Sequence, residues 1–492
     1  MGARLDHIGK RRQEKLSALR ALGIDPYPYA CHRSHTVEEA LALFEQQEAG
    51  GETGESVSVA GRVMANRSMG KTSFLDIRDG FGKMQLFFRR DVLGTDKFTL
   101  LRQLDIGDII GASGKVFRTK SGEPTIEVED FILLAKSLQP LPEKWHGLSD
   151  IDKRYRQRYL DLIANAEVKE VFRVRSLVIT AIRQFLNRRG FLEVETPVLQ
   201  ASAGGAAARP FVTHHHTLDQ DFYLRIALEL YLKRLIIGGF DKVYELGRIF
   251  RNEGLSTKHN PEFTMLESYE AYADYNDVME MLQEMVSGVC REVLGTDKVV
   301  FGEASIDFKP PWQRLTLRDA VREYSGLDFV QYPEADLLRA KMQELGLEVD
   351  PEKDWAKLVD GLVSTFVEPK LIQPTFLLDY PVSMSPLAKR KPDSDRVVER
   401  FEAFAGGMEI ANAFTELNDP LEQRQRFISQ QESRQGEDDV EEYIDQDFLL
   451  AMEHGMPPTG GLGVGIDRLV MLLTNRESIR EVILFPHLRE KE

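Results

Sequence analysis

Side chains able to bind an anion, a planar ring or a cation recur on one face of a hairpin that the sequence predicts. Two runs of β-type residues, 243–253 and 262–272, are joined by a polar loop, which predicts a hairpin with a long loop. Successive side chains of a strand alternate between its faces. A strand buried on both sides is apolar throughout, so a polar face here indicates either a solvated surface or a binding surface. The odd-numbered face carries Arg251, Glu253, Phe263, Glu267 and Tyr269.

A pair of glutamates lies in a second predicted hairpin. Residues 400–419 read RFEAFAGGMEIANAFTELND, with a two-residue turn at 406–407. That turn pairs Glu402 with Ala411 and makes Glu402 and Glu409 diagonal neighbours on one face. Adjacent carboxylates repel each other unless a cation lies between them, and Mg²⁺ usually takes one or two carboxylates together with substrate phosphates. The spacing therefore indicates a magnesium site.

Two further polar residues of this segment have the wrong parity for that face. By simple alternation, Asn412 and Glu416 lie opposite to Glu409. All of these side chains can contact one ligand only if a bulge or bend follows Glu409. The sequence leaves this point open.

Small residues surround the other candidate ligand contacts. Residues 460–474 read GGLGVGIDRLVMLLT, where a glycine-rich segment leads into an apolar helix with Arg468 in its first turn. Without Gly-Lys-Ser/Thr and a preceding βαβ unit, the glycines are weak support for a nucleotide loop. In the small-residue loop 203–208 the backbone can approach a ligand closely. The consecutive histidines 214–216 are not expected to bind a metal, because neighbouring side chains of an extended loop diverge.

Upstream, five short strands between residues 57 and 134 predict a closed barrel of the oligonucleotide-binding (OB) type. Such barrels stack bases on aromatic rings and read base edges with polar groups. Phe74 and Gln85 fall on neighbouring strands, and Glu123 lies beside a turn. Arg62 and Arg67 are suited to phosphates, whereas by composition alone Phe74 fits the barrel core better than a stacking platform.

Helices are predicted around both sheets. Residues 1–35 form a basic amphipathic helix with its flanking segment, which suits phosphate, a membrane, a partner helix or simple solvation. Residues 138–149 read as a proline-containing linker, and 153–162 and 171–189 as helices. Residues 274–400 alternate helices, extended pieces and prolines, and are interpreted as a helical insertion followed by a return to the main domain.

The composition is that of a globular protein of two or three domains. The chain has 492 residues, 42% of them hydrophobic, and a net charge of −16, which argues against general coating of nucleic acid. Cys31 and Cys290 are the only cysteines, so a reducing cytoplasm is expected. No signal peptide and no apolar run approaching ~20 residues is recognised, so a soluble, intracellular protein is expected.

Three signals, in order, resemble the three motifs of the class II aminoacyl-tRNA synthetases. They are GFLEVETP at 190–197, FRNEG at 250–254 followed by HNPEF at 259–263, and GLGVGIDR at 461–468. Within that class GGAAARPF, ELYLKRL, HNPEFTMLE and GIDRLVMLLT look like the bacterial type of lysyl-tRNA synthetase, and the similarity covers nearly the whole chain.

The resemblance implies an α+β multidomain fold. An N-terminal OB-fold β-barrel is followed by a class II catalytic domain, in which helices flank an antiparallel β-sheet. The expected divisions are a basic helical extension at 1–54, an anticodon-binding barrel at 55–140, a linker at 141–160 and a catalytic domain at 161–492. A helical insertion is expected at roughly 274–370.

The resemblance also implies residue roles. Arg251 and Arg468 are the expected catalytic residues, since a guanidinium fork suits phosphate and carboxylate alike. The expected ATP contacts are Arg251, Glu253, His259, Asn260, Phe263 and Arg468. The expected amino-acid contacts are Gly205, Glu229, Arg251, Glu267, Tyr269, Asn412 and Glu416. Glu402 and Glu409 are the expected Mg²⁺ ligands, with more than one ion per site, and Arg62, Phe74, Gln85 and Glu123 the anticodon contacts.

The charge of the pocket predicts the amino acid. Glu267 and Glu416, with the Tyr269 hydroxyl, form an anionic end that a long side chain with an ammonium satisfies, whereas aspartate is repelled. The expected activity is ATP-dependent ligation of lysine to tRNA(Lys) by a homodimer formed through residues 183–197. Three alternatives stay open: an aspartyl or asparaginyl synthetase, a paralogue that lysylates a protein, and a non-catalytic RNA-binding protein.

Four positions depart from the family pattern. Leu228 stands where a proline usually precedes the glutamate, and Met408 where an arginine is frequent. Ala411 and Ala413 stand where glycines are common. None of these changes removes a charged group that the chemistry needs, so activity is expected and only its rate is open.

Overall fold

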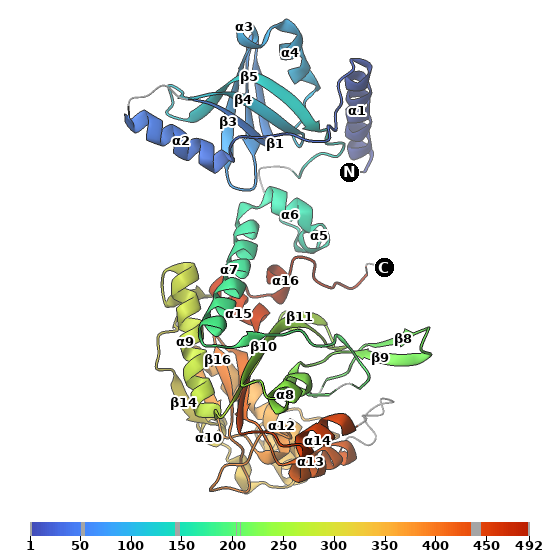
Figure 1. Ribbon diagram of the computed structural model, residues 1–492, viewed down its shortest axis with the longest axis vertical. Coiled ribbons are helices and arrows are strands. Elements are labelled where there is room, and N and C mark those ends of the chain that lie inside the picture. Colours follow the sequence, from blue (N-terminus) through green and yellow to red (C-terminus); the bar gives the residue numbers. More distant parts are fainter. Residues whose placement is uncertain are drawn as a thin grey trace. The chain divides into compact units, whose positions relative to one another are not determined.

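The computed structural model describes residues 2–50, 55–142, 148–202, 204–206, 208–433 and 444–490, with side chains from His7 onward. It divides into two compact units, residues 1–149 and 150–492 (Figure 1), and each unit is described by itself. Parts of three sequence predictions lie outside the described residues: the side chains at the start of the N-terminal helix, the middle of the linker at 143–147, and residues 203 and 207 of the small-residue loop.

The first unit contains the predicted barrel. Its strands close in the order β1-β2-β3-β5-β4, and buried and accessible residues alternate along β1, as expected for a barrel wall. Short helices α3 (Arg90–Leu93) and α4 (Thr95–Leu100) cross between β3 and β4. The strand bounds are β1 Ser56–Met69, β2 Thr72–Arg78, β3 Lys83–Arg89, β4 Ile109–Arg118 and β5 Pro124–Ala135.

Two helices, α1 (Gly2–Ala21) and α2 (Val37–Gly50), contribute to the core of the barrel unit. α1 is held by its own basic side chains: Arg12 donates to the Gln139 carbonyl at 2.7 Å, and Lys15 pairs with Asp105 at 2.7 Å. Part of the basic face predicted from the sequence is therefore used to attach the helix to the barrel.

The second unit is built on an eight-stranded sheet (Figure 1). The strand order is β14-β15-β16-β17-β18-β11-β10-β6. The six central strands pair antiparallel, and β14 and β6 pair parallel at the two edges. The bounds are β6 Leu192–Glu193, β10 Lys242–Phe250, β11 Glu262–Ala271, β14 Gln313–Thr316, β15 Thr375–Leu378, β16 Arg400–Ala405, β17 Met408–Thr415 and β18 Thr459–Gly465.

One face of this sheet is covered by helices α7 (Ala166–Arg188), α9 (Tyr275–Leu294) and α15 (Ile466–Leu473), which share an apolar core with it. Figure 1 shows α7 and α9 beside one another on the sheet. The apolar stripe predicted for α7 is mostly buried there. The preceding predicted helix is two helices, α5 (Ile151–Arg156) and α6 (Arg158–Ala164). The covered face leaves the other side of the sheet for polar side chains.

The span 274–370 divides between two apolar cores. α9 packs on the sheet and β14 belongs to it, whereas α10 (Leu317–Ser325), α11 (Ala335–Glu344) and α12 (Trp355–Leu362) share a second core with Leu377 of β15 and Phe404 of β16. The remaining main elements are β7 Leu199–Gln200, β8 Val212–His215, β9 Gln220–Leu224, α8 Glu229–Ile237, β12 Lys298–Phe301, β13 Ala304–Asp307, α13 Pro420–Ser433, α14 Gln446–Glu453 and α16 Ile479–Val482. Within the described ranges no helix combines the length and apolar character needed to cross a bilayer.

Candidate active site

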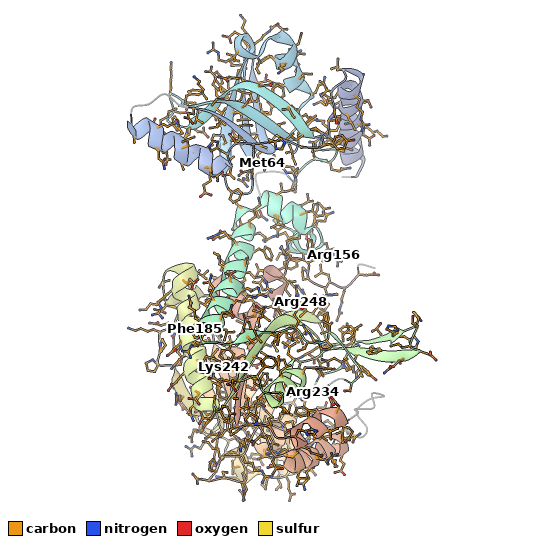
Figure 2. All side chains as sticks on the ribbon, viewed as in Figure 1. Met64, Arg156, Phe185, Arg234, Lys242 and Arg248 are labelled. Atoms are coloured by element: carbon orange, nitrogen blue, oxygen red, sulfur yellow. The ribbon has the colours of Figure 1, made fainter. Side chains whose placement is uncertain are left out.

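The predicted central hairpin is formed by β10 and β11, with Phe250 opposite Glu262 and Glu245 opposite Glu267. Lys242 and Arg248, labelled in Figure 2, pair across it with glutamates of β11. β10 ends at Phe250, so Arg251 and Glu253 lie in the loop rather than on the strand, contrary to the expectation. The Arg251 amide still donates to the Pro261 carbonyl at 2.8 Å, which carries the pairing one step into the loop.

Arg251 and Phe263 lie together at the mouth of the hairpin. The guanidinium carbon is 5.2 Å from the centre of the Phe263 ring, and Nε donates to the Ile226 carbonyl at 3.3 Å. Burial lowers the pKa of Arg251, but an arginine side chain stays charged in proteins. A fixed cation beside an aromatic ring suits a phosphate next to a planar base.

The loop of the hairpin reaches α15. Arg468 donates through one nitrogen to the Glu409 carboxylate at 2.9 Å and through another to His259 Nε2 at 3.3 Å. Burial and the Arg468 charge lower the pKa of His259, which favours the neutral, accepting imidazole. The Asn260 amide donates to the Glu262 carbonyl at 2.6 Å and accepts from the His487 amide at 3.2 Å, so its polar atoms hold the loop in place.

A bulge brings the glutamates of the second hairpin to one face. Phe404 pairs with Glu409 as predicted, but Glu402 pairs with Asn412 instead of Ala411, because the register shifts between Ala403 and Phe404. The extra residue brings Asn412 and the alternate residues after it to the face that carries Glu409. The bend that the sequence analysis left open is therefore present.

Glu402 lies in a pocket suited to a cation. Its carboxylate accepts from the Tyr380 hydroxyl at 2.7 Å and from Arg400 at 2.6 Å. Burial, and in smaller part the charge of Glu409, raise the pKa of Glu402 to about 7 despite Arg400. Two neighbouring carboxylates are a donor set that Mg²⁺ fits when phosphate oxygens complete its coordination.

Glu267 and Tyr269 stand together at the other end of the site, as predicted. Glu267 accepts from the Leu228 amide at 3.0 Å and from the Tyr269 hydroxyl at 3.1 Å. Burial raises the pKa of Glu267 to about 7, with Glu229 adding to the effect. The pKa of Tyr269 is also raised, first by burial and then by Glu267, so this hydroxyl keeps its proton.

Glu416 was expected to be a carboxylate available to the substrate, but the protein already pairs one of its oxygens with a lysine. Lys233, fully buried on α8, makes an ion pair with Glu416 and another with Glu229 at 2.5 Å. The remaining oxygen of Glu416, Oε1, has no hydrogen-bond partner within the described ranges. Lys233 was not predicted from the sequence, although its position one helical turn after Glu229 was a usable signal.

Glycines make room for these carboxylates. A Cβ atom on Gly461 would lie 1.8 Å from Glu416 Oε1 and 2.7 Å from Tyr269 Cε1. Gly205 has a φ of +86°, and a Cβ atom there would lie 3.4 Å from the Glu229 side chain. The glycine-rich strand β18 therefore serves the pocket through the space it leaves, which the sequence analysis did not foresee.

All the catalytic-unit residues predicted to bind ATP, the amino acid or Mg²⁺ line one cavity of about 1160 Å³. Arg400, also missed from the sequence, lines it too and donates to Asn412 at 3.1 Å. Glu253 and His259 lie on the Arg468 side of the cavity, and Glu229, Glu267 and Glu416 cluster around Lys233 and Leu228. The cavity thus has a cationic and aromatic end and an anionic end.

The candidate nucleic-acid residues lie on the barrel. Phe74 stacks on Phe87, with ring centres 4.6 Å apart. Gln85 donates to Glu123 at 3.0 Å, so this predicted pair is in contact. Arg62 donates to the Gly107 carbonyl at 2.8 Å, which ties it to the barrel.

An antiparallel sheet with this cavity, joined to a five-stranded barrel, defines a class II tRNA synthetase. Residues 150–489 match the family model described as "tRNA synthetases class II (D, K and N)", and residues 57–134 match that of the "OB-fold nucleic acid binding domain".

Relatives that align over nearly the whole chain identify the family within this class. A lysine–tRNA ligase of Dehalococcoides mccartyi is 60% identical, with 99% of this chain and 98% of the relative covered. One of Moorella thermoacetica is 56% identical, covering 98% and 97%, and one of Roseiflexus castenholzii is 54% identical, covering 99% and 100%. The chain belongs to the lysine–tRNA ligase family.

Proposed function

We propose that this chain activates L-lysine with ATP to lysyl-adenylate and transfers the lysyl group to the 3′-terminal adenosine of tRNA(Lys). The observation that carries the proposal is the charge at the anionic end of the cavity. Glu229, Glu267 and Glu416 are buried together, and Lys233 is the ammonium buried among them. Uncompensated buried charges are costly, so this end favours a ligand that brings positive charge.

Lysine matches that charge. Three buried carboxyl groups face the single buried ammonium of Lys233, and the substrate brings an α-ammonium and an ε-ammonium. The substrate's own carboxylate goes to Arg251, which lies in the loop of the hairpin. An aspartate side chain would add a negative charge where the pocket is already anionic, so it is excluded by repulsion.

The first chemical step needs no general base. The lysine carboxylate attacks the α-phosphorus of ATP in line, the new bond is carboxyl oxygen to phosphorus, and pyrophosphate leaves. Arg251 and Arg468 orient the reactants and stabilise the charge that develops on the phosphoryl oxygens. Phe263 and Arg468 hold the adenine ring between them, with Glu253 at its edge and His259 near the triphosphate.

Glu402 and Glu409 would hold Mg²⁺, which when bound neutralises charge on the triphosphate. Their like charges and the raised pKa of Glu402 support this assignment. Asn412 assists at the substrate carboxylate; its position opposite Glu402 in the sheet supports this role.

The barrel reads the anticodon through Phe74, Gln85, Glu123 and Arg62. The partly accessible, stacked Phe74 and Phe87 rings offer a surface for a base, and the contact of Gln85 with Glu123 gathers polar groups on a neighbouring strand. The remaining basic side chains of α1 add an RNA contact.

The enzyme acts as a homodimer in the cytoplasm. Residues 183–197 include β6, an edge strand of the main sheet, and Leu192 is 48% exposed there. An edge strand with an exposed leucine is suited to association with a second copy.

Amino-acid-dependent exchange of pyrophosphate into ATP, run with lysine and with aspartate in parallel, tests the proposal. Lysine-dependent exchange, followed by charging of tRNA(Lys), is the expected result. Exchange with aspartate would point to an aspartyl-type enzyme, exchange without tRNA charging to a paralogue that modifies a protein, and no exchange to a non-catalytic RNA-binding protein.

A further inference from the structure

The backbone amide of Leu228 is directed into the anionic end of the cavity. Leu228 precedes the first residue of α8, with φ −98° and ψ −17°, and its side chain is fully buried in an apolar cluster. Its N–H is not part of the helical ladder and donates to Glu267 Oε1 at 3.0 Å. The side chain anchors the turn, and the amide contacts the carboxylate.

Both oxygens of Glu267 are thereby oriented by the protein, since Oε2 accepts from Tyr269. The two donors differ in kind. The Tyr269 hydroxyl can rotate and also accept, whereas a backbone amide only donates. A donor that cannot reverse its role favours the ionised form of the carboxylate.

We infer that the Leu228 amide is a positioning group for lysine recognition, which holds Glu267 ionised and oriented toward the substrate ε-ammonium. A proline, the residue that the family pattern usually has at this position, has no N–H, so this chain makes a contact that a proline cannot make. The inference rests on the proposed function.

The charged groups around Glu267 make its ionisation sensitive to the Leu228 amide. Tyr269 and Glu267 share β11, Glu229 faces them from α8, Glu416 from beyond β17, and Arg251 from the loop of the hairpin. Burial and the charge of Glu229 raise the pKa of Glu267 to about 7, against the opposing effects of the Leu228 amide, Tyr269 and Arg251. A carboxyl group that titrates near the working pH responds to the loss of one donor.

The test compares Leu228→Pro with Leu228→Ala in the full-length enzyme. Both variants lose the buried leucyl side chain, but only the proline variant lacks the amide proton. The measurement is kcat/KM for lysine in ATP–pyrophosphate exchange between about pH 6 and 9, because the pH dependence of kcat/KM reports the ionisation of the free enzyme. KM for ATP shows whether the rest of the site is intact.

In the wild type, kcat/KM falls as pH decreases through the pKa of Glu267. We expect Leu228→Pro to move this decline to higher pH and to lower kcat/KM about tenfold near neutral pH, the scale of one hydrogen bond to a charged group. Leu228→Ala should keep the wild-type midpoint. Identical midpoints for the two variants would overturn the inference.

If the proline variant does not fold, replacement of the Leu228 backbone amide by an ester tests the inference instead. The ester keeps the leucyl side chain and removes only the N–H, and the same shift is expected; an unchanged midpoint contradicts the inference. Failure of the proposed function is separate, because the wild-type enzyme would then show no lysine-dependent exchange at all.

Discussion

At the scale of single residues, the site depends on carboxylates whose charge the fold makes costly. Glu267 is buried, surrounded by other glutamates and titrates near neutral pH, and Glu416 is compensated on one side only, by Lys233. A free enzyme that stores unfavourable charge gains when a ligand of opposite charge arrives. Affinity for lysine and instability of the empty pocket therefore have one cause.

Replacing Glu267 by Gln should weaken lysine activation strongly. The amide is nearly isosteric and can still accept from the Leu228 N–H and donate to Tyr269, so the change removes charge more than shape. We expect kcat/KM for lysine to fall by a factor equivalent to about 2–4 kcal/mol of transition-state binding. ATP–pyrophosphate exchange measures this fall, and KM for ATP should stay close to the wild-type value. An unchanged kcat/KM for lysine would remove Glu267 from the pocket.

The same substitution should stabilise the ligand-free protein in a pH-dependent way. The pKa of Glu267 rises from 4.5 to about 7 on folding, so between these values the folded state binds more protons there than the unfolded state. Its contribution to the free energy of unfolding therefore falls as pH rises through this window. Thermal unfolding should show Glu267→Gln gaining more over wild type at about pH 8 than at about pH 5. An equal gain at both values would mean that Glu267 titrates normally.

At the scale of elements, backbone irregularities bring the site together. The bulge between β16 and β17 places Asn412 opposite Glu402, and the glycines of β18 leave the space that side chains of the neighbouring strands occupy. Gly461 lies opposite both Tyr269 and Phe414 in the sheet. Because Gly461 has no side chain, the carboxylate of Glu416 can lie next to β18.

Gly461→Ala should therefore damage lysine recognition, with Gly463→Ala as the matched control on the same strand. A methyl group on Gly461 would overlap Glu416 Oε1 at 1.8 Å, whereas on Gly463 it would meet the Asn412 carbonyl at 3.7 Å and Glu267 Cγ at 3.9 Å, both ordinary contacts. We expect KM for lysine to rise at least about tenfold for Gly461→Ala and to change little for Gly463→Ala. Equal effects of the two changes would show that Gly461 only maintains the strand.

At the scale of the whole molecule, two compact units divide two tasks. The cavity for activation lies entirely within residues 150–492, and the candidate anticodon residues lie within 1–149. Chemistry on lysine and ATP should therefore be separable from recognition of tRNA.

Phe74→Ala tests that separation in the full-length chain. Loss of one base-stacking ring costs about 1–3 kcal/mol, so kcat/KM for tRNA(Lys) in aminoacylation should fall roughly 5- to 150-fold. The rate of ATP–pyrophosphate exchange without tRNA should be the same as that of wild type. Loss of activity in both assays would indicate that Phe74 belongs to the barrel core, the position that sequence composition alone favours.

The sequence by itself predicted the barrel, the central antiparallel hairpin and several of the side chains that line the cavity. Alternation along a strand and turn chemistry are local properties, so Phe263, Glu267 and Tyr269 were correctly placed on one face. Tertiary structure decided the rest: the bulge in β17, the contact of Gly461 with Glu416, and the ion pair that joins Glu416 to Lys233 from a distant helix. Each of these depends on which distant segments meet in space, and spacing along a chain carries no record of that.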